Sequence, residues 1–173
     1  NNLTSPKQMA FDPQGRLHIV EEWEERILRW DPSTGATEII LNNSEYAASG
    51  PIEGIAIAQS TGDLYFSEYG VFGNEAPDPQ GRGVYAGVPM KSGAVWVKRL
   101  ASGNIELVAR GFWRTRGLAL DEARGILYVA NEANAWDQGS SGCLSAIDLN
   151  HGNSVIKVAV GLDYPQYPAL QAS

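Results

Sequence analysis

The chain has 173 residues, and its 20 acidic against 13 basic side chains give a formal net charge of −7. This length suits a single domain, and the negative charge argues against binding to nucleic acid or to an anionic membrane surface. No apolar run reaches the roughly 18 residues of a membrane-spanning helix. With one cysteine, Cys143, the chain can form neither an intramolecular disulfide framework nor a cysteine-based zinc site.

Short apolar runs, repeated along the chain, are the first predicted elements. The first run of each unit covers residues 9–12, 55–58 or 118–121, and after a turn the second run covers 17–21, 64–68 or 127–131. These runs are rich in β-branched and aromatic residues and are bounded by Gly and Pro. They therefore predict strands.

Each pair of runs is followed by two more predicted strands that form a hairpin. The third strands are 26–30, 94–98 and 143–147, and the fourth strands are 37–41, 105–109 and 154–158. At the hairpin tips, Gly35, Gly103 and Gly152 supply the positive φ that tight turns need. No segment predicts a helix convincingly. Four antiparallel strands per unit, repeated, predict an all-β fold made of β-propeller blades.

The repeat places the blades of this single domain, residues 1–173, at about 5–44, 50–111 and 114–161, with the start of a fourth blade at 162–173. A propeller ring needs about 4–8 blades, and a six-bladed ring needs roughly 240 residues. Three blades alone would expose apolar faces that only a neighbour could bury. The chain is therefore either a fragment of a longer propeller or half of a six-bladed ring that a second copy completes. A compact four-bladed monomer is disfavoured.

Residues 5–40, SPKQMAFDPQGRLHIVEEWEERILRWDPSTGATEII, resemble the NHL-type β-propeller repeat. GPIEGIAIAQSTGDLYFSEYG and TRGLALDEARGILYVANEAN resemble the equivalent stretches of that repeat and of the SMP-30/gluconolactonase and strictosidine-synthase-like six-bladed propellers. The resemblance extends over nearly the whole chain. It implies the propeller architecture and is poorly specific for any one activity.

One mouth of the central channel is the predicted functional site. The start of each first strand and the end of each second strand lie at the same end of a blade, and the first strand of a blade is innermost. Six polar side chains should therefore gather at one mouth: Lys7, Glu53 and Arg116 from the first strands, and Glu21, Glu68 and Asn131 from the second strands.

Two long connections, residues 69–93 and 132–142, follow second strands and should rim the same mouth. Loops on a rigid scaffold are where binding residues concentrate. The first carries Phe72, Asn74, Glu75, Asp78 and Tyr85, and the second carries Asn134, Trp136 and Asp137.

The segment Ile52-Glu53-Gly54 resembles the metal-binding Glu-Gly turn of SMP-30-like enzymes. The resemblance implies that Glu53 is a ligand of Ca²⁺ or another divalent cation, with Asn131, Asn134 or Asp137 as candidate neighbours. In a metal-dependent lactone or ester hydrolase of this kind, Arg116 and Asp137 would be the catalytic residues, Arg116 stabilising the oxyanion. The matching positions in the other two blades are Lys7 and Arg116, which cannot ligate a metal.

Structural interpretations compete with these roles. We expect Glu53 to form a salt bridge with Arg116 or Lys7, and Glu21 and Glu68 to be solvated strand ends. We also expect Trp23 and Trp136 to cover a blade edge rather than stack on a sugar or ring. Three further residues of types that often act in catalysis are expected to be structural: His18, His151 and Cys143. We expect Cys143 to be a small buried hydrophobe.

The complete ligand set of a metal centre is missing, so the sequence favours a ligand- or protein-binding propeller over an enzyme. The ligand contacts would come from the polar residues of the mouth: Lys7, Glu21, Glu68, Asn131, Asn134 and Trp136. A metal-dependent hydrolase is the alternative, and only that alternative requires a cofactor. The glycosylation sequons Asn2-Leu3-Thr4 and Asn42-Asn43-Ser44 slightly favour a secreted protein.

Overall fold

A computed structural model describes residues 3–47, 50–70, 93–132 and 142–170 of the chain. The elements of the first sheet are β1 (Pro6–Phe11), β2 (Leu17–Glu21), β3 (Arg26–Trp30) and β4 (Thr37–Asn42), followed by a 3-10 turn at Asn43–Glu45. The second sheet contains β5 (Ile52–Ile57), β6 (Leu64–Glu68), β7 (Gly93–Lys98) and β8 (Ile105–Phe112). The third contains β9 (Thr115–Asp121), β10 (Ile126–Asn131), β11 (Gly142–Asp148) and β12 (Ser154–Leu162).

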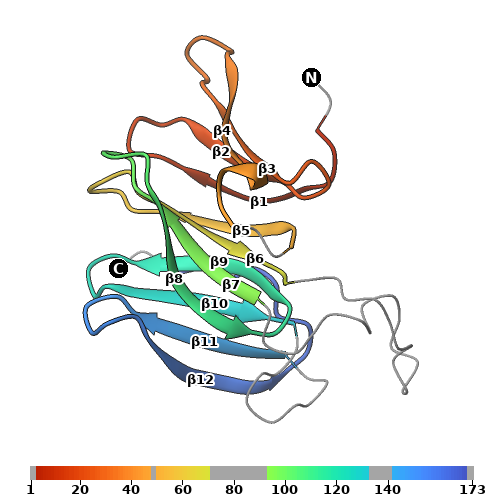
Figure 1. Ribbon diagram of the computed structural model, residues 1–173, viewed down its shortest axis with the longest axis vertical. Helices are drawn as coiled ribbons and strands as arrows, with labels where there is room; N and C mark the ends of the chain where they lie inside the picture. The colour runs from red at the N-terminus through yellow and green to blue at the C-terminus, as the bar shows by residue number, and fades with distance from the viewer. Residues whose placement is uncertain (1–2, 48–49, 71–92, 133–141, 171–173) are drawn as a thin grey trace.

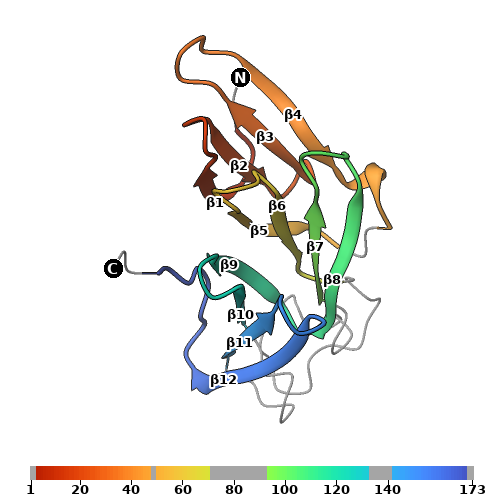
Figure 2. The same ribbon diagram turned by 90° about the vertical axis from the view of Figure 1, so that its left-hand side faces the viewer.

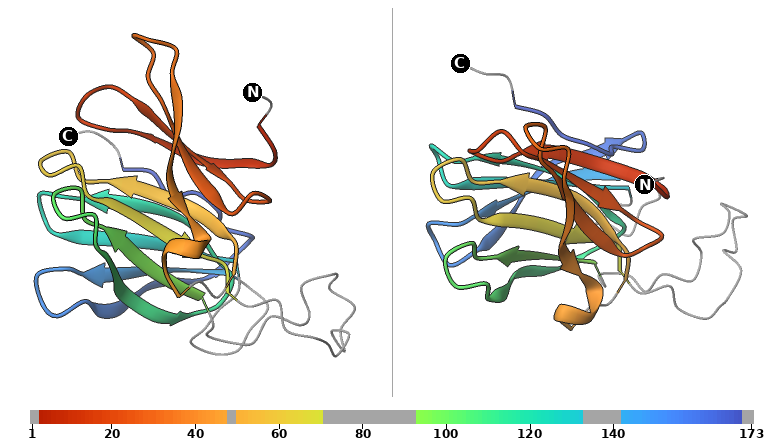
Figure 3. Two further views of the ribbon diagram at one scale, coloured as in Figure 1. Left: turned by 45° about the horizontal axis from the view of Figure 1, so that its top comes forward. Right: turned by 90° about the horizontal axis from the view of Figure 1, so that it is seen from above.

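Each sheet is a four-stranded antiparallel meander whose strands follow one another in chain order. The sheets stack as layers (Figures 1 and 3) and fan apart like blades, with β1, β5 and β9 innermost and β4, β8 and β12 outermost (Figure 2). The all-β propeller architecture predicted from the sequence is confirmed. The innermost strands each begin three residues earlier than predicted, at residues 6, 52 and 115.

Two apolar clusters join neighbouring blades. Between the first and second sheets, Val20, Ile27 and Leu41 pack with Ile55 and Phe66. Between the second and third sheets the cluster combines side chains of both, among them Val95, Val97, Leu118, Leu127 and Ile147. Burial of these alternate residues on facing sheets is what stabilises the blade stack.

The two outer sides of the stack expose apolar side chains. On the first sheet, Met9, Ile19, Leu28 and Ile39 lie opposite one another in the strand register, on the face turned away from the second sheet. Ile19 and Leu28 in the middle of this row are buried, and the two ends of the row are exposed. Met9 and Ile39 are 56% and 54% exposed. At the other end, β12 exposes three more residues, Ile156, Val158 and Val160.

The start of a fourth blade is predicted at residues 162–173. After β12 ends at Leu162, the described part of this segment, residues 163–170, contains no strand. These residues nevertheless lie beside β9, because the Gly117 N–H donates to the Gln166 carbonyl at 2.6 Å. Because these residues form no strand, the boundary of a fourth blade stays a prediction.

No helix in the described ranges is long and apolar enough to cross a membrane.

Candidate functional site

A β-bulge lies at the same place in each innermost strand. In β1, Pro6 is paired with Glu21 and Met9 with Ile19, so two residues of β1 oppose one residue of β2. The same irregularity lies between Ile52 and Gly54 of β5, and opposite Val129–Asn131 in β9. A bulge re-aims the side chain that it contains. The residues in the three bulges include Lys7, Glu53 and Arg116.

Arg116 connects the second and third blades. Its Nη1 donates to Glu53 Oε1 and its Nη2 to Glu132 Oε2, both at 2.8 Å. The guanidinium carbon lies 4.6 Å from the centroid of the Tyr69 ring, and the Tyr69 hydroxyl donates to Glu132 Oε2 at 3.0 Å. All four side chains are buried. The salt bridge predicted between Glu53 and Arg116 is confirmed.

The first blade contributes a second ion pair beside Glu53. Lys7 Nζ lies 3.0 Å from Glu22 Oε2, and the Ser5 hydroxyl donates to the same oxygen at 2.8 Å. The charges of Lys7 and Glu22 both act on Glu53. We call the six side chains that three blades bring together the mouth network: Lys7, Glu22, Glu53, Tyr69, Arg116 and Glu132.

Glu53 is the electrostatically unusual member of the mouth network. Burial raises the pKa of its carboxyl to about 7, with a further contribution from the negative charge of Glu22, although the positive charge of Arg116 acts in the opposite direction. Its second oxygen, Oε2, is buried and has no hydrogen-bond donor. Two carboxylates cannot donate to each other, so Glu53 interacts favourably with Glu22 only when one of them carries a proton.

Glu22 and Arg116 have pKa values shifted in the direction that favours their charged forms. Burial opposes ionisation of Glu22, but its hydrogen bonds from Lys7 and Ser5 bring the pKa of this carboxyl below its usual value. Burial also opposes the charge of Arg116, and the carboxylates of Glu53 and Glu132 outweigh it and raise the pKa of the guanidinium.

Three predicted mouth residues point into their own blades instead. Glu21 is fully buried and accepts from Arg26 Nε at 2.6 Å. Glu68 is likewise buried and accepts from Trp96 Nε1 at 2.8 Å. The expectation that both are solvated strand ends is therefore wrong, because both carboxylates are fully buried and accept hydrogen bonds from the next strand of their own blade.

Asn131 is also buried within its own blade, where its Nδ2 donates to Ser145 Oγ at 3.2 Å. The residue after each second strand reaches the mouth network instead. The backbone N–H groups of Glu22, Tyr69 and Glu132 donate to the carbonyls of the strand-start residues Ser5, Pro51 and Arg114. Since side chains alternate along a strand, a shift of one residue exchanges the two faces. The sequence feature that could have identified Glu22, Tyr69 and Glu132 is that each of them carries a carboxylate or a hydroxyl directly after a second strand.

Other predictions have mixed outcomes. Cys143 is buried, as expected, and His18 is buried against Asp12. Trp23 is 77% exposed, so the expectation that it covers a blade edge is wrong. Several candidates lie outside the described residues, namely Phe72, Asn74, Glu75, Asp78, Tyr85, Asn134, Trp136 and Asp137.

Behind the mouth network, the Gln8 side chain connects all three innermost strands. Its Nε2 donates to the Leu118 carbonyl at 2.7 Å, and its Oε1 accepts from the N–H groups of Leu118 and Ile55 at 2.9 and 3.1 Å. The innermost strands are therefore fixed relative to one another at this level of the channel.

The donor set of the mouth does not fit a divalent cation. One oxygen of Glu53 is bound by Arg116, and the other two bulges carry the cations Lys7 and Arg116. Over the ranges that the structure describes, no three His, Cys, Asp or Glu side chains are grouped to hold a metal. No catalytic step through a metal follows from these residues.

No protein-family model and no curated protein matches the sequence significantly. Solved structures do match. The structure of a nidogen/laminin complex aligns with a TM-score of 0.68 and 17% identity, over 95% of this chain and 52% of the other chain. A gluconolactonase from Xanthomonas campestris gives 0.65 and 19%, over 94% and 51%, and TolB from Acinetobacter baumannii gives 0.55 and 13%, over 88% and 31%. These identities show the fold alone. The chain spans about half the length of the first two structures.

Proposed function

We propose that this chain is a non-catalytic, ligand-binding part of a β-propeller and that the channel mouth holds the ligand. The observation that carries the proposal is the carboxylate of Glu53. One of its oxygens is fixed by Arg116, while the other is buried without a donor. A buried acceptor without a partner costs about 1–3 kcal/mol, and a ligand that donates a hydrogen bond would remove this cost.

The charges of the mouth network indicate the class of ligand. Three carboxylates, of Glu22, Glu53 and Glu132, are matched by two cations, Lys7 and Arg116. Among these five charged side chains of the mouth network, one negative charge has no matching cation unless Glu53 holds a proton. A small organic ammonium supplies both the missing positive charge and the missing donor, so it is the ligand class that this mouth suits best.

Ethylammonium binding should therefore become about tenfold tighter between pH 6 and pH 8. A carboxyl with a pKa of about 7 is mostly protonated at pH 6 and mostly ionised at pH 8. Isothermal titration with ethylammonium chloride at the two pH values measures the effect, and Glu53→Gln should abolish binding at both. Glu38→Gln, the same change at a 58% exposed side chain, is the matched control and should bind like the wild type.

Equal ethylammonium affinity at pH 6 and pH 8, or wild-type affinity in Glu53→Gln, would overturn this proposal. The same titration with CaCl₂ addresses the alternative function, a divalent-metal-dependent lactone or ester hydrolase. Stoichiometric Ca²⁺ that is lost in Glu53→Gln would support the hydrolase.

We further propose that a second copy of the chain covers the exposed apolar sides and completes a ring with the first. Light scattering on a sizing column should then give a mass near twice 18.7 kDa. Met9→Ser with Phe11→Ser should shift the mass toward the monomer, because both side chains are more than half exposed. Trp23→Ser, at an exposed tryptophan in the β2–β3 connection, is the control and should leave the mass unchanged.

A well-folded monomer would contradict the proposed second copy. Concentration-dependent aggregation of the wild type would indicate that further blades of a longer chain cover these sides. The ligand titrations at the mouth are interpreted separately, because the mouth network lies within one copy of the chain.

A further inference from the structure

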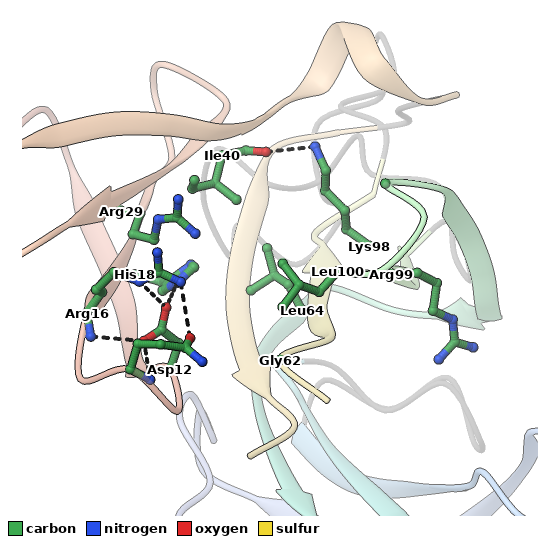
Figure 4. A pocket seen from close by; sticks show the side chains of 12 residues that line it. Asp12, Arg16, His18, Arg29, Ile40, Gly62, Leu64, Lys98, Arg99 and Leu100 are labelled. Atoms are coloured by element: carbon green, nitrogen blue, oxygen red, sulfur yellow. Dashed lines mark hydrogen bonds and ion pairs between the residues drawn. The ribbon is translucent and has the colours of Figure 1, made fainter. Parts of the chain in front are cut away.

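A small pocket lies between the first two blades, at the end of the blades away from the mouth network (Figure 4). The β1–β2 turn contributes Asp12 and Arg16, and the second blade contributes Gly62 and Leu100 from its turns. In an antiparallel meander these turns and the mouth lie at opposite ends of the strands. The pocket has a volume of about 80 Å³, which is roughly half of the ~150 Å³ of a cavity known to hold benzene.

The walls and the rim of the pocket differ in chemistry. The side chains of Ile40, Leu64 and Leu100 form an apolar wall. Four cations lie among the polar side chains, and each of them is paired with a carboxylate. The cations that line the pocket are Arg16, Arg29, Lys98 and Arg99.

Asp12, the acidic residue of the pocket, is already fully engaged. One of its oxygens accepts from the N–H groups of Gln14 and Arg16, at 3.0 and 2.9 Å. The other accepts from Arg16 Nε at 2.8 Å and lies 3.1 Å from His18 Nε2. Although burial acts in the opposite direction, these contacts lower the pKa of the Asp12 carboxyl. The Asp12 carboxylate is therefore used by Arg16 and His18 and does not neutralise the other cations of the pocket.

The guanidinium groups have donors left for a ligand. Arg29 uses Nε and Nη2 on Glu38, and Arg99 uses Nε on Glu106 and Nη1 on Asp63. A guanidinium carries five N–H donors in a planar fork. Figure 4 shows the Arg99 guanidinium directed away from His18 and Asp12, so it is not a donor on their side of the pocket. The Nη1 group of Arg29 is the guanidinium group left for a contact with a carboxylate.

His18 adds an independent sign of a ligand. The residue is 5% exposed and lines the pocket, its Nε2 contacts Asp12, and its Nδ1 is buried without a partner. Burial lowers the pKa of this imidazole, Asp12 opposes that change, and the positive charges of Arg29 and Arg16 reinforce it. Lys98 and Arg99 of the second blade line the same pocket. A nearby anion would favour the imidazolium, whose Nδ1–H then becomes a donor.

We propose that this pocket binds a small monocarboxylate with a short hydrocarbon chain. The carboxylate contacts Nη1 of Arg29 and the unpartnered Nδ1 of His18, and the chain lies against Ile40, Leu64 and Leu100. The pocket volume suits a chain of about four carbon atoms. Nothing in this inference depends on the ligand of the channel mouth, because Asp12 and the four cations are not members of the mouth network.

Proton NMR of the two histidines tests the proposal on the intact chain. At constant ionic strength, sodium butyrate should move the His18 ring resonances saturably, toward those of the imidazolium, with a dissociation constant on the order of millimolar. His151, whose side chain is 78% exposed in a turn of the third blade, is the internal reference and should not move. Neutral butyramide, which has nearly the same shape, should leave His18 unchanged.

Arg29→Gln should weaken butyrate binding at least tenfold. Arg124→Gln is the matched control, because this arginine is 77% exposed and pairs with Asp121 on the third blade. Binding in this control should equal that of the wild type. Equal shifts with butyramide and butyrate would overturn the proposal, and so would a static His18 or an equal loss in the two variants. The comparison of butyrate with butyramide needs no variant, so it remains decisive if Arg29→Gln does not fold.

Discussion

Replacing Arg116 with methionine should lower the free energy of unfolding by about 3–5 kcal/mol, the usual cost of removing one partner of a buried ion pair. The guanidinium is the cation that both Glu53 and Glu132 contact, at 2.8 Å each. Without it, Glu53 would lie beside Glu22 and Glu132 would lose its cation, with Lys7 as the remaining cation of the mouth network. Methionine fills a similar volume, so the loss reports the charge and its hydrogen bonds rather than a cavity.

Urea denaturation at pH 8, where Glu53 is ionised, measures this loss. Arg124→Met is the matched control, because its ion pair with Asp121 is exposed and should contribute at most about 1 kcal/mol. Adding Glu53→Gln and Glu132→Gln to Arg116→Met should restore part of the stability, since the unpaired charges are then gone. If the free energy of unfolding falls no more in Arg116→Met than in the control, the ion pairs of Arg116 with Glu53 and Glu132 do not stabilise the fold as predicted.

The strand pattern could be predicted because the physical signal is local. Alternating apolar residues between Gly and Pro, as in 17–21 or 64–68, predict strands whatever lies next to them. The starts of the innermost strands were missed because they contain Lys7, Glu53 or Arg116 in place of apolar residues. A charged residue there indicates a strand only when a bulge directs it into a polar channel, and the bulge follows from pairing with the next strand.

The candidate site could be predicted in part for the same reason. The first-strand positions of Lys7, Glu53 and Arg116 follow from aligning the repeats, and their convergence follows from the meander. Which residue after each second strand joins them depends on the bulge, so Glu22 and Glu132 were missed. The pocket beside His18 was also missed, because its walls come from two blades whose spacing no local pattern encodes.

A glycine beside the mouth network provides the second large expected effect. A Cβ on Gly54 would lie 2.5 Å from the Arg116 carbonyl oxygen, 2.7 Å from Gly117 Cα and 2.9 Å from Gln8 Oε1. Two of these three atoms belong to the backbone of β9, which cannot rotate away. Gly54→Ala should therefore separate β5 from β9 and lower the free energy of unfolding by about 3 kcal/mol or more.

Gly35→Ala separates this steric cost from the ordinary cost of losing a glycine. Gly35 has a φ of +72° at a hairpin tip with open space around it, so its substitution should cost about 1 kcal/mol through backbone strain alone. Urea denaturation of the two variants compares the costs directly.

Separation of β5 from β9 should also break the hydrogen bonds that Gln8 makes to Ile55 and Leu118. The Arg116–Glu53 pair joins the same two strands, β9 and β5. Gly54→Ala should therefore weaken ethylammonium binding as well, whereas Gly35→Ala should leave it unchanged. Equal losses of stability in both variants would mean that the innermost strands can move apart freely, and that the close approach at Gly54 does not position the mouth network.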